Sequence, residues 1–278
     1  MSPRPWLTGW TLDDPPKLGY SYLPRDEWPD TGGIRTHLTF RDSRLTEATD
    51  GLIGAQYVGY CGDGSEDEDH GWHFHDLDWQ CFLLLAGTMT QETEEFGPTH
   101  LSAGDTAYYP GIYWHREYDF SPDWEMVALR VPAKTKTTTG RDQPLPERAA
   151  GMDPNRRAVY SFERPGAYVA GTGPEQQFAY RDLGSAIPSE GRLAMRIVKA
   201  AAPGASSPRH HHSSSSWFVV MSGSALIRVG EEPEVELGYR DAMSIGPGPG
   251  MAHTIRSASE DFKIFELTIP AEYETVEE

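Results

Sequence analysis

The chain has 278 residues and a formal net charge of −18 at neutral pH. This length is sufficient for one large or two modest domains, each with a buried core. The acidic balance argues against partners that need a basic protein surface, so we expect neither nucleic acid nor an anionic membrane as a partner.

The composition favours strands over helices. The 28 glycines and 22 prolines occur together with 8 Trp, 13 Tyr and 10 Phe, which is typical of short strands joined by turns. The two cysteines, Cys61 and Cys81, do not form a disulfide framework. The first residues do not resemble a signal peptide, and no apolar run approaches the length of a membrane span. We therefore expect an all-β, cytoplasmic protein.

Residues 1–36 contain many prolines and aromatic side chains. This composition predicts an extended N-terminal arm that packs on the surface of a folded domain. The alternative is an arm that is exchanged with a second copy of the chain, which would make the protein a homodimer.

The first folded unit is expected over residues 37–135. It contains an acidic loop at 63–70, which we interpret as a solvated loop, with a lid or an extra ligand from His70 as the alternative. Two histidines follow, His73 and His75. Residues two apart on a strand point to the same face, so both imidazoles can be directed at one point. Gln80 then precedes an apolar run, 81–86, that ends at Gly87.

A second segment of this unit, residues 104–115, supplies another imidazole, His115, behind a turn with glycine and proline. Three imidazole nitrogens and an amide oxygen from Gln80 form a ligand set of intermediate hardness. Such a set suits a divalent transition metal (Zn, Fe, Ni, Mn or Co) rather than Ca or Mg. Gln80 could instead orient a water or a substrate.

The unit of about 100 residues occurs twice. Phe40–Asp42 recurs as Tyr180–Asp182, and in both copies a glycine follows nine residues later. The distance from His115 to Pro132 is seventeen residues, as is the distance from His253 to Pro270. Residues 136–160 between the copies have the Lys, Thr and Pro content of a linker. The second unit is therefore expected at 161–278.

The second copy contains three consecutive histidines before its apolar run. Aligned without a gap, it places Arg209 and His211 at the positions of the first imidazole pair; deletion of one loop residue places His210 and His212 there. Ser216 occupies the position of Gln80. The candidate ligands are His210, His212 and His253. The alternatives are a barrel without metal that serves as a scaffold, or a surface cluster that binds metal adventitiously.

These spacings resemble the two motifs of the cupin superfamily, G-x5-H-x-H-x3-4-E-x6-G and G-x5-P-x-G-x2-H. Two departures from them stand out, Gln80 at the glutamate position and Ile112 at the second-motif glycine. The resemblance implies a bicupin with two tandem cupin barrels of the double-stranded β-helix, or jelly-roll, type. It also implies one metal held by His73, His75, Gln80 and His115, and a degenerate or second metal site in the C-terminal barrel.

The run Trp72–Gln80 and the segment His115-Arg116-Glu117 resemble cupins with three histidines and a glutamine, such as the resistomycin-type polyketide cyclases and the bacilysin-pathway bicupin isomerase. The neutral ligand set would leave the charge of the metal uncompensated and strengthen it as a Lewis acid. The resemblance thus implies an enzyme that stabilises an enolate of a small oxygenated, aromatic or polyketide-like substrate, with isomerisation, cyclisation or lyase cleavage as the outcome.

Two other functions stay open. One is an Fe(II)-dependent dioxygenase that cleaves a ring or a C–C bond, and the other is a non-catalytic bicupin that binds a small molecule. In an enzyme, a phenol or carboxylate near the metal would move a proton, and the candidate catalytic residues are Tyr108, Tyr113 and Glu117. The many aromatic residues near the motifs would suit a flat substrate.

Overall fold

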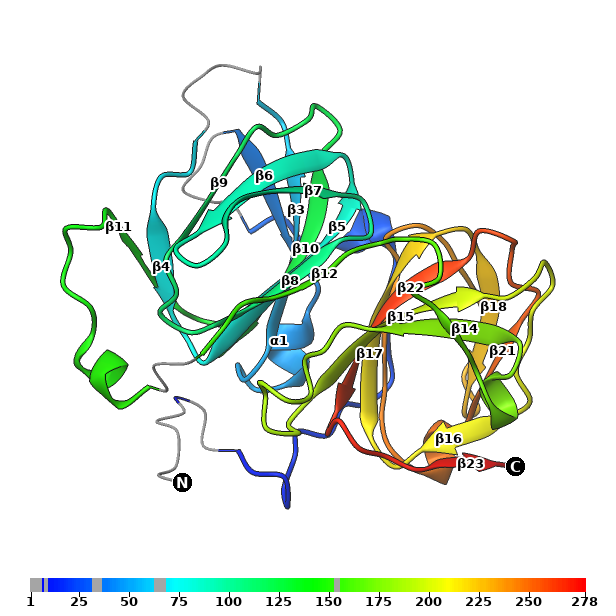
Figure 1. The fold of residues 1–278 in the computed structure, drawn as a ribbon. Coiled ribbons are helices and arrows are strands. Elements are labelled where there is room, and N and C mark those ends of the chain that lie inside the picture. Colours follow the sequence, from blue (N-terminus) through cyan, green and yellow to red (C-terminus); the bar gives the residue numbers. More distant parts are fainter. Residues whose placement is uncertain (1–6, 8–9, 32–36, 63–68, 153–155) are drawn as a thin grey trace. The chain divides into compact units, whose positions relative to one another are not determined.

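The computed structural model of the chain describes residues 7, 10–31, 37–62, 69–152 and 156–278. These residues form two compact units, Met1–Gly9 with Pro29–Glu163 and Trp10–Trp28 with Arg164–Glu278 (Figure 1). Regular structure is almost entirely strand, with a single helical turn, α1 (Leu45–Ala48), and short 3-10 turns among the described residues. None of the described helices has the length and apolar character needed to span a membrane.

The first unit consists of two antiparallel sheets. The six-stranded sheet has the order β12 (Val159–Ser161), β8 (Thr106–Pro110), β5 (Trp79–Ala86), β10 (Glu125–Val131), β3 (Gly54–Tyr60) and β2 (Leu38–Asp42). The five-stranded sheet has the order β11 (Lys136–Thr139), β4 (His73–Asp76), β9 (His115–Tyr118), β6 (Thr88–Thr93) and β7 (Gly97–Ser102). Together they form a jelly-roll barrel.

The second unit repeats this plan. Its seven-stranded sheet has the order β1 (Ser21–Leu23), β20 (Ala242–Ile245), β17 (Ser215–Ser222), β22 (Lys263–Ile269), β15 (Ala194–Ala200), β14 (Phe178–Asp182) and β13 (Val169–Ala170). Its five-stranded sheet has the order β19 (Val235–Leu237), β18 (Ala225–Val229), β21 (His253–Arg256), β16 (His210–His212) and β23 (Thr275–Glu277). The predicted all-β fold of two tandem barrels is confirmed.

The internal repeat extends to local backbone geometry. Gly87 follows β5 and Gly223 follows β17, with φ of 69° and 67°. A Cβ at Gly87 would lie 2.8 Å from the nitrogen of Trp124, and one at Gly223 would lie 2.6 Å from the nitrogen of Phe262. Only glycine combines this φ with so close a backbone approach, which explains why both copies have glycine here.

The ends of the two units differ from those expected from composition. Within the predicted arm, β1 adds an edge strand to β20 of the second unit. Within the predicted linker, β11 pairs with β4 and β12 pairs with β8, both in the first unit. The two units therefore divide after Glu163. Threonine-rich segments such as 136–139 favour strands, and an edge strand has the same polar composition as a linker.

The two faces of β10 show how the first barrel is organised. Val127, Leu129 and Val131 are buried in the core. The alternating residues Met126, Ala128 and Arg130 line an internal cavity of about 300 Å³. One face of the strand thus packs in the core of the unit, and the other face forms a wall of the cavity.

Candidate metal centres

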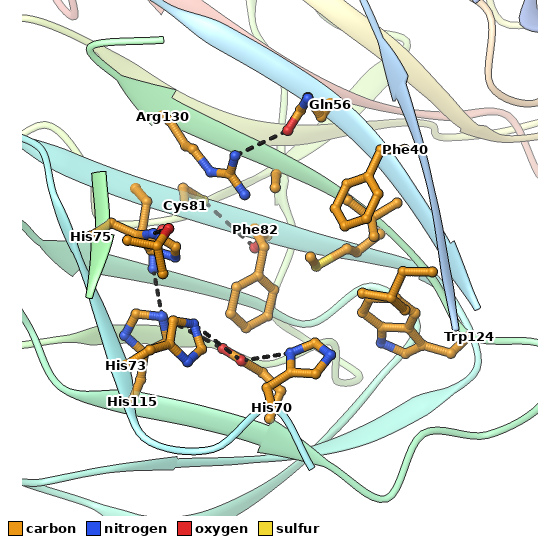
Figure 2. Close-up of a pocket in the computed structure, with 17 residues that line it drawn as sticks. Phe40, Gln56, His70, His73, His75, Cys81, Phe82, His115, Trp124 and Arg130 are labelled. Atoms are coloured by element: carbon orange, nitrogen blue, oxygen red, sulfur yellow. Dashed lines mark hydrogen bonds and ion pairs between the residues drawn. The ribbon is translucent and has the colours of Figure 1, made fainter. Parts of the chain in front are cut away.

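Three imidazoles of the first unit converge at one end of this cavity. His73 and His75 lie on the same face of β4, and His73 is paired in register with His115 on β9. The ring centroids of His73 and His115 are 4.3 Å apart, and those of His73 and His75 are 5.1 Å apart. One ring nitrogen of each histidine lies within 4.8 Å of the other two (Figure 2). The structure therefore brings together the three histidines predicted from the motifs.

Hydrogen bonds to the backbone orient two of these rings. The Nδ1 of His73 lies 2.9 Å from the carbonyl oxygen of Gly71, and that of His115 lies 2.7 Å from the carbonyl oxygen of Tyr113. A carbonyl oxygen only accepts, so each Nδ1 is the protonated nitrogen and donates. In the neutral ring, Nε2 then carries the lone pair, as is typical of histidines that bind metal.

The third ring, His75, has its Nδ1 2.8 Å from the hydroxyl oxygen of Thr137 on β11. Burial, together with the nearby Arg130 guanidinium, holds the pKa of His75 well below its ordinary value. Burial and the neighbouring His73 lower the pKa of His115 to about 4. Both rings are therefore neutral at pH 7, which is the protonation state that metal binding requires.

Gln80 lies beside the imidazole cluster. Its Nε2 is 3.0 Å from Nε2 of His115, in position to donate to that lone pair. The terminal amide carries an oxygen on the same carbon, so Gln80 brings a neutral oxygen ligand to the cluster. This donor set of imidazoles and an amide fits a divalent transition metal.

A carboxylate also reaches the cluster. Glu117 lies on the same face of β9 as His115, and its oxygens are 3.7 Å from Nε2 of His73 and 3.7 Å from Nε2 of His115. The carboxylate accepts a hydrogen bond from Nε2 of Gln91 at 3.2 Å and contacts Nδ1 of His70 at 3.1 Å. His70, considered above as an extra ligand, thus contacts Glu117. Residues 63–68 of the acidic loop lie outside the described part of the chain.

The charge of Glu117 follows from these neighbours. Burial alone would raise the pKa of this carboxyl, but the imidazoles of His115, His73 and His70 hold the pKa well below its usual value. Glu117 is therefore ionised at pH 7. The expectation of a neutral surrounding for the metal, which rested on Gln80 alone, has to be revised, because a negative charge from another strand lies beside the three histidines.

The other two candidate proton carriers do not line the cavity. The ring of Tyr108 stacks on Trp79, with centroids 5.8 Å apart, and the hydroxyl of Tyr113 donates to Glu95 at 2.9 Å. Because side chains alternate along β8, Tyr109 is the residue that faces the cluster, and its ring stacks on His115 at 5.1 Å. A catalytic role for Tyr108, Tyr113 or Glu117 stays a prediction, and of these three residues Glu117 is the one that lines the cavity.

Ile112, which stands at the glycine position of the second motif, has φ of 51°. This is the left-handed region that glycine occupies freely and that a β-branched residue rarely adopts. The turn before His115 therefore keeps the conformation that the motif glycine would favour. Strained backbone of this kind is often found next to functional sites.

The cavity above the cluster has two kinds of wall. Its apolar wall consists of Leu38, Phe40, Val58, Phe82, Trp124 and Met126. Its polar part includes Gln56 and Arg130, which sequence reasoning missed. The sequence did contain a signal for Arg130, because it is a charged residue within an apolar strand and lies on the same face as Met126 and Ala128. The partner strands that surround this face could not be read from the sequence.

The second barrel contains a matching cluster of His210, His212 and His253. The centroids of His210 and His253 are 4.3 Å apart, and those of His210 and His212 are 5.1 Å apart. The Nδ1 of His210 donates to the carbonyl of Pro208 at 2.9 Å. The gapped alignment is therefore the one that the structure supports, while His211 lies 3.5 Å from the carboxylate of Glu278.

The second cluster lacks the room of the first. Its cavity has a volume of about 30 Å³, and Arg196 lines it while paired with Glu266 and, at 2.9 Å, with Glu175. Ser216, at the position of Gln80, has a buried hydroxyl that makes no hydrogen bond among the described residues. A space of this size holds about one water, so the second barrel offers a candidate metal site without space for a substrate.

The buried histidines predict how stability depends on pH. Burial lowers the pKa of His115 and of His212 to about 4, whereas an unfolded chain protonates histidine near its ordinary value of about 6.5. Between these values the unfolded state binds more protons. We expect the free energy of unfolding of the metal-free protein to fall by about 1.4 kcal/mol per pH unit for each of these two groups as the pH is lowered from about 6.5 to 4. Urea titrations at pH 7, 6 and 5 measure this, and equal stability at pH 7 and pH 5 would contradict it.

Comparison with known proteins agrees with the observed fold. The family model described as a cupin domain matches residues 198–269, within the second barrel. No curated protein sequence matches the chain.

Among solved structures, procruciferin, an 11S globulin from Brassica napus, has a TM-score of 0.61 at 12% identity, with 94% of this chain and 86% of that chain covered. An 11S globulin from Wrightia tinctoria, for which an auxin binding site is described, has a TM-score of 0.65 at 9% identity, with 94% and 85% covered. Oxalate decarboxylase from Bacillus subtilis has a TM-score of 0.59 at 14% identity, with 92% and 78% covered. At these identities the likeness shows the fold.

Proposed function

Given that the chain is a bicupin of the cupin superfamily, we propose that it is a metal-dependent enzyme that acts on a small oxygenated substrate in its first barrel. The observation that carries the proposal is the convergence of three imidazoles, the Gln80 amide and the ionised Glu117 at one end of a cavity of about 300 Å³. A site with ligands, a candidate base and an adjoining cavity has the parts that catalysis needs.

His73, His75, His115 and Gln80 would hold the metal. When bound, a divalent metal supplies Lewis acidity, which stabilises negative charge on a carbonyl oxygen of the substrate. Glu117 is the residue placed to accept a proton from the carbon next to that carbonyl, and to return it at another position. Its contacts with Gln91 and His70 keep the carboxylate oriented toward the imidazoles.

Isomerisation, cyclisation and lyase cleavage share this first proton transfer. The apolar wall with Phe40, Phe82 and Trp124 supports an aromatic or polyketide-like substrate. These side chains would also keep water away from the reacting carbon.

A dioxygenase is the second candidate, and the position of Glu117 favours it. Three histidines with a carboxylate nearby resemble the mixed imidazole and carboxylate sites that hold Fe(II) in oxygenases. A non-catalytic binding protein is the third, since cupin-type barrels host different functions and globulins are among the similar structures.

We expect the metal-loaded protein to catalyse deuterium exchange at carbon next to a carbonyl without oxygen. The measurement is ¹H NMR of enolisable carbonyl compounds in D₂O under strict exclusion of O₂, with Zn, Ni, Mn, Co or Fe loaded in turn. The same mixtures in air, followed with an oxygen electrode, test the dioxygenase. Oxygen uptake that depends on iron, or binding of the compounds without exchange, would contradict the proposal.

A further inference from the structure

Arg130 is placed to act on the occupant of the first cavity. On β10 it is directly opposite Gln80 of β5 in the strand register, so both side chains emerge on the cavity face. Figure 2 shows the guanidinium across the cavity from His73 and His115 and on the same side as Gln56. The group thus lies in the same space as the imidazole cluster.

The charge of Arg130 has no acidic partner among the described residues. Its Nη1 donates to the amide oxygen of Gln56 at 3.0 Å, and its Nε is buried without a hydrogen-bond partner. Gln56 orients the guanidinium but, being neutral, does not compensate it. Burial lowers the pKa of Arg130, and the negative charge of Glu117 in the same cavity raises it. Glu117, however, contacts the histidines rather than Arg130. Burying a guanidinium without a negative counter-charge costs free energy. This cost indicates that an anionic ligand neutralises Arg130.

The second barrel shows the compensated arrangement. There Arg196 on β15 is opposite Glu266 on β22, and it pairs with Glu266 and Glu175. In the first barrel the corresponding pair of positions is held by Gln56 and Ala128. The second barrel therefore neutralises its guanidinium internally and leaves a cavity of about 30 Å³, whereas the first leaves both the charge and about 300 Å³ of space available.

We propose that Arg130 binds the carboxylate of the substrate, and that the substrates are oxo acids with an aromatic or branched apolar body. A planar guanidinium matches a carboxylate, and one positive charge balances a monoanion. The apolar wall of the cavity would contact the apolar body of the substrate. The placement of the carbonyl at the imidazole cluster rests on the function proposed above, while the carboxylate contact rests on Arg130 and Gln56 alone.

The test uses phenylpyruvate, which has a carboxylate, a carbonyl and an aromatic ring, and its methyl ester, which lacks the charge. Calorimetric titration of the zinc-loaded protein is expected to show at least about tenfold tighter binding of the acid than of the ester. Arg130→Gln should remove at least about tenfold of the affinity for the acid and leave the affinity for the ester unchanged. Arg141→Gln is the matched control, because Arg141 is an exposed arginine of the same unit, paired with Glu94.

A second variant keeps the test decisive if Arg130→Gln does not fold. Gln56→Glu places a carboxylate at the acceptor position and neutralises the guanidinium in place, so it should lose acid binding as Arg130→Gln does while the melting temperature rises. Acid binding of wild-type strength in either variant would overturn the proposal. A wild-type protein that does not bind phenylpyruvate, or does not prefer it to the ester, would overturn it as well.

The two proposals fail in different ways. If the proposed function is wrong, phenylpyruvate binds through Arg130 but undergoes no deuterium exchange. If the inference about Arg130 is wrong, binding of the acid does not depend on Arg130 or Gln56, whatever the exchange experiment shows.

Discussion

The substitution His115→Ala is expected to remove metal from the first cluster, with a loss of affinity of at least about 100-fold, because it deletes one of three converging imidazoles. The Nε2 of His115 lies 3.0 Å from Nε2 of Gln80 and 3.7 Å from a carboxylate oxygen of Glu117, within the group of candidate ligands. Metal content after equilibrium dialysis against Zn or Co measures the loss. His73→Ala should behave in the same way.

The second cluster requires a control of its own. His253→Ala should remove only metal held in the second barrel, and the double variant should bind none. His100→Ala is the matched control, because His100 is an exposed histidine of the first unit outside both clusters. Full metal occupancy of the first barrel in His115→Ala would contradict the ligand assignment.

The substitution Glu117→Gln is expected to lower the rate of deuterium exchange by about 10²- to 10⁴-fold while metal content is retained, because it removes the only carboxylate that contacts the cluster among the described residues and keeps the shape of the side chain. The amide can still contact Gln91 and His70. The measurements are the exchange rate and the metal content of the same preparation.

Glu95→Gln serves as the control for this variant, since Glu95 interacts with Tyr113 and Arg157 instead of the imidazoles. An unchanged exchange rate in Glu117→Gln would show that another group takes the proton. Loss of metal in Glu117→Gln would show that the carboxylate is a ligand, which would contradict its role as the base.

Most histidines of the two clusters could be predicted from the sequence because their spacing within short segments determines which face of a strand they share. Residues two apart on a strand share a face, so the pairs His73 with His75 and His210 with His212 follow from spacing. The internal repeat then locates His115 and His253 at equal distances from the closing proline. In the second copy spacing alone allowed two alignments, and only the fold excludes the one with His211.

The missing parts depend on which strands are neighbours. Glu117 reaches the imidazoles because β9 lies between β4 and β6, and Arg130 faces Gln80 because β10 lies beside β5. Spacing within one segment does not encode these contacts. The substitution of glutamate by Gln80 therefore suggested a neutral site, whereas a carboxylate on a different strand supplies the charge.

Composition led to the prediction of a linker where the structure has polar edge strands. The segments 136–139 and 159–161 have linker composition but pair with β4 and β8 of the first barrel. One of these pairings has a direct effect on the site, since Thr137 on β11 holds the ring of His75. Hydrogen bonding to an existing sheet, rather than the intrinsic preference of the segment, orders such strands.

The function proposed for the first barrel requires that His73, His75 and His115 bind one metal ion. Anomalous diffraction from crystals of the zinc-loaded protein, purified without a histidine tag and measured on both sides of the zinc absorption edge, tests it most directly. We expect an anomalous peak at about 2.0–2.1 Å from Nε2 of each of these three histidines. Zinc held elsewhere, with no peak between these three rings, would contradict it.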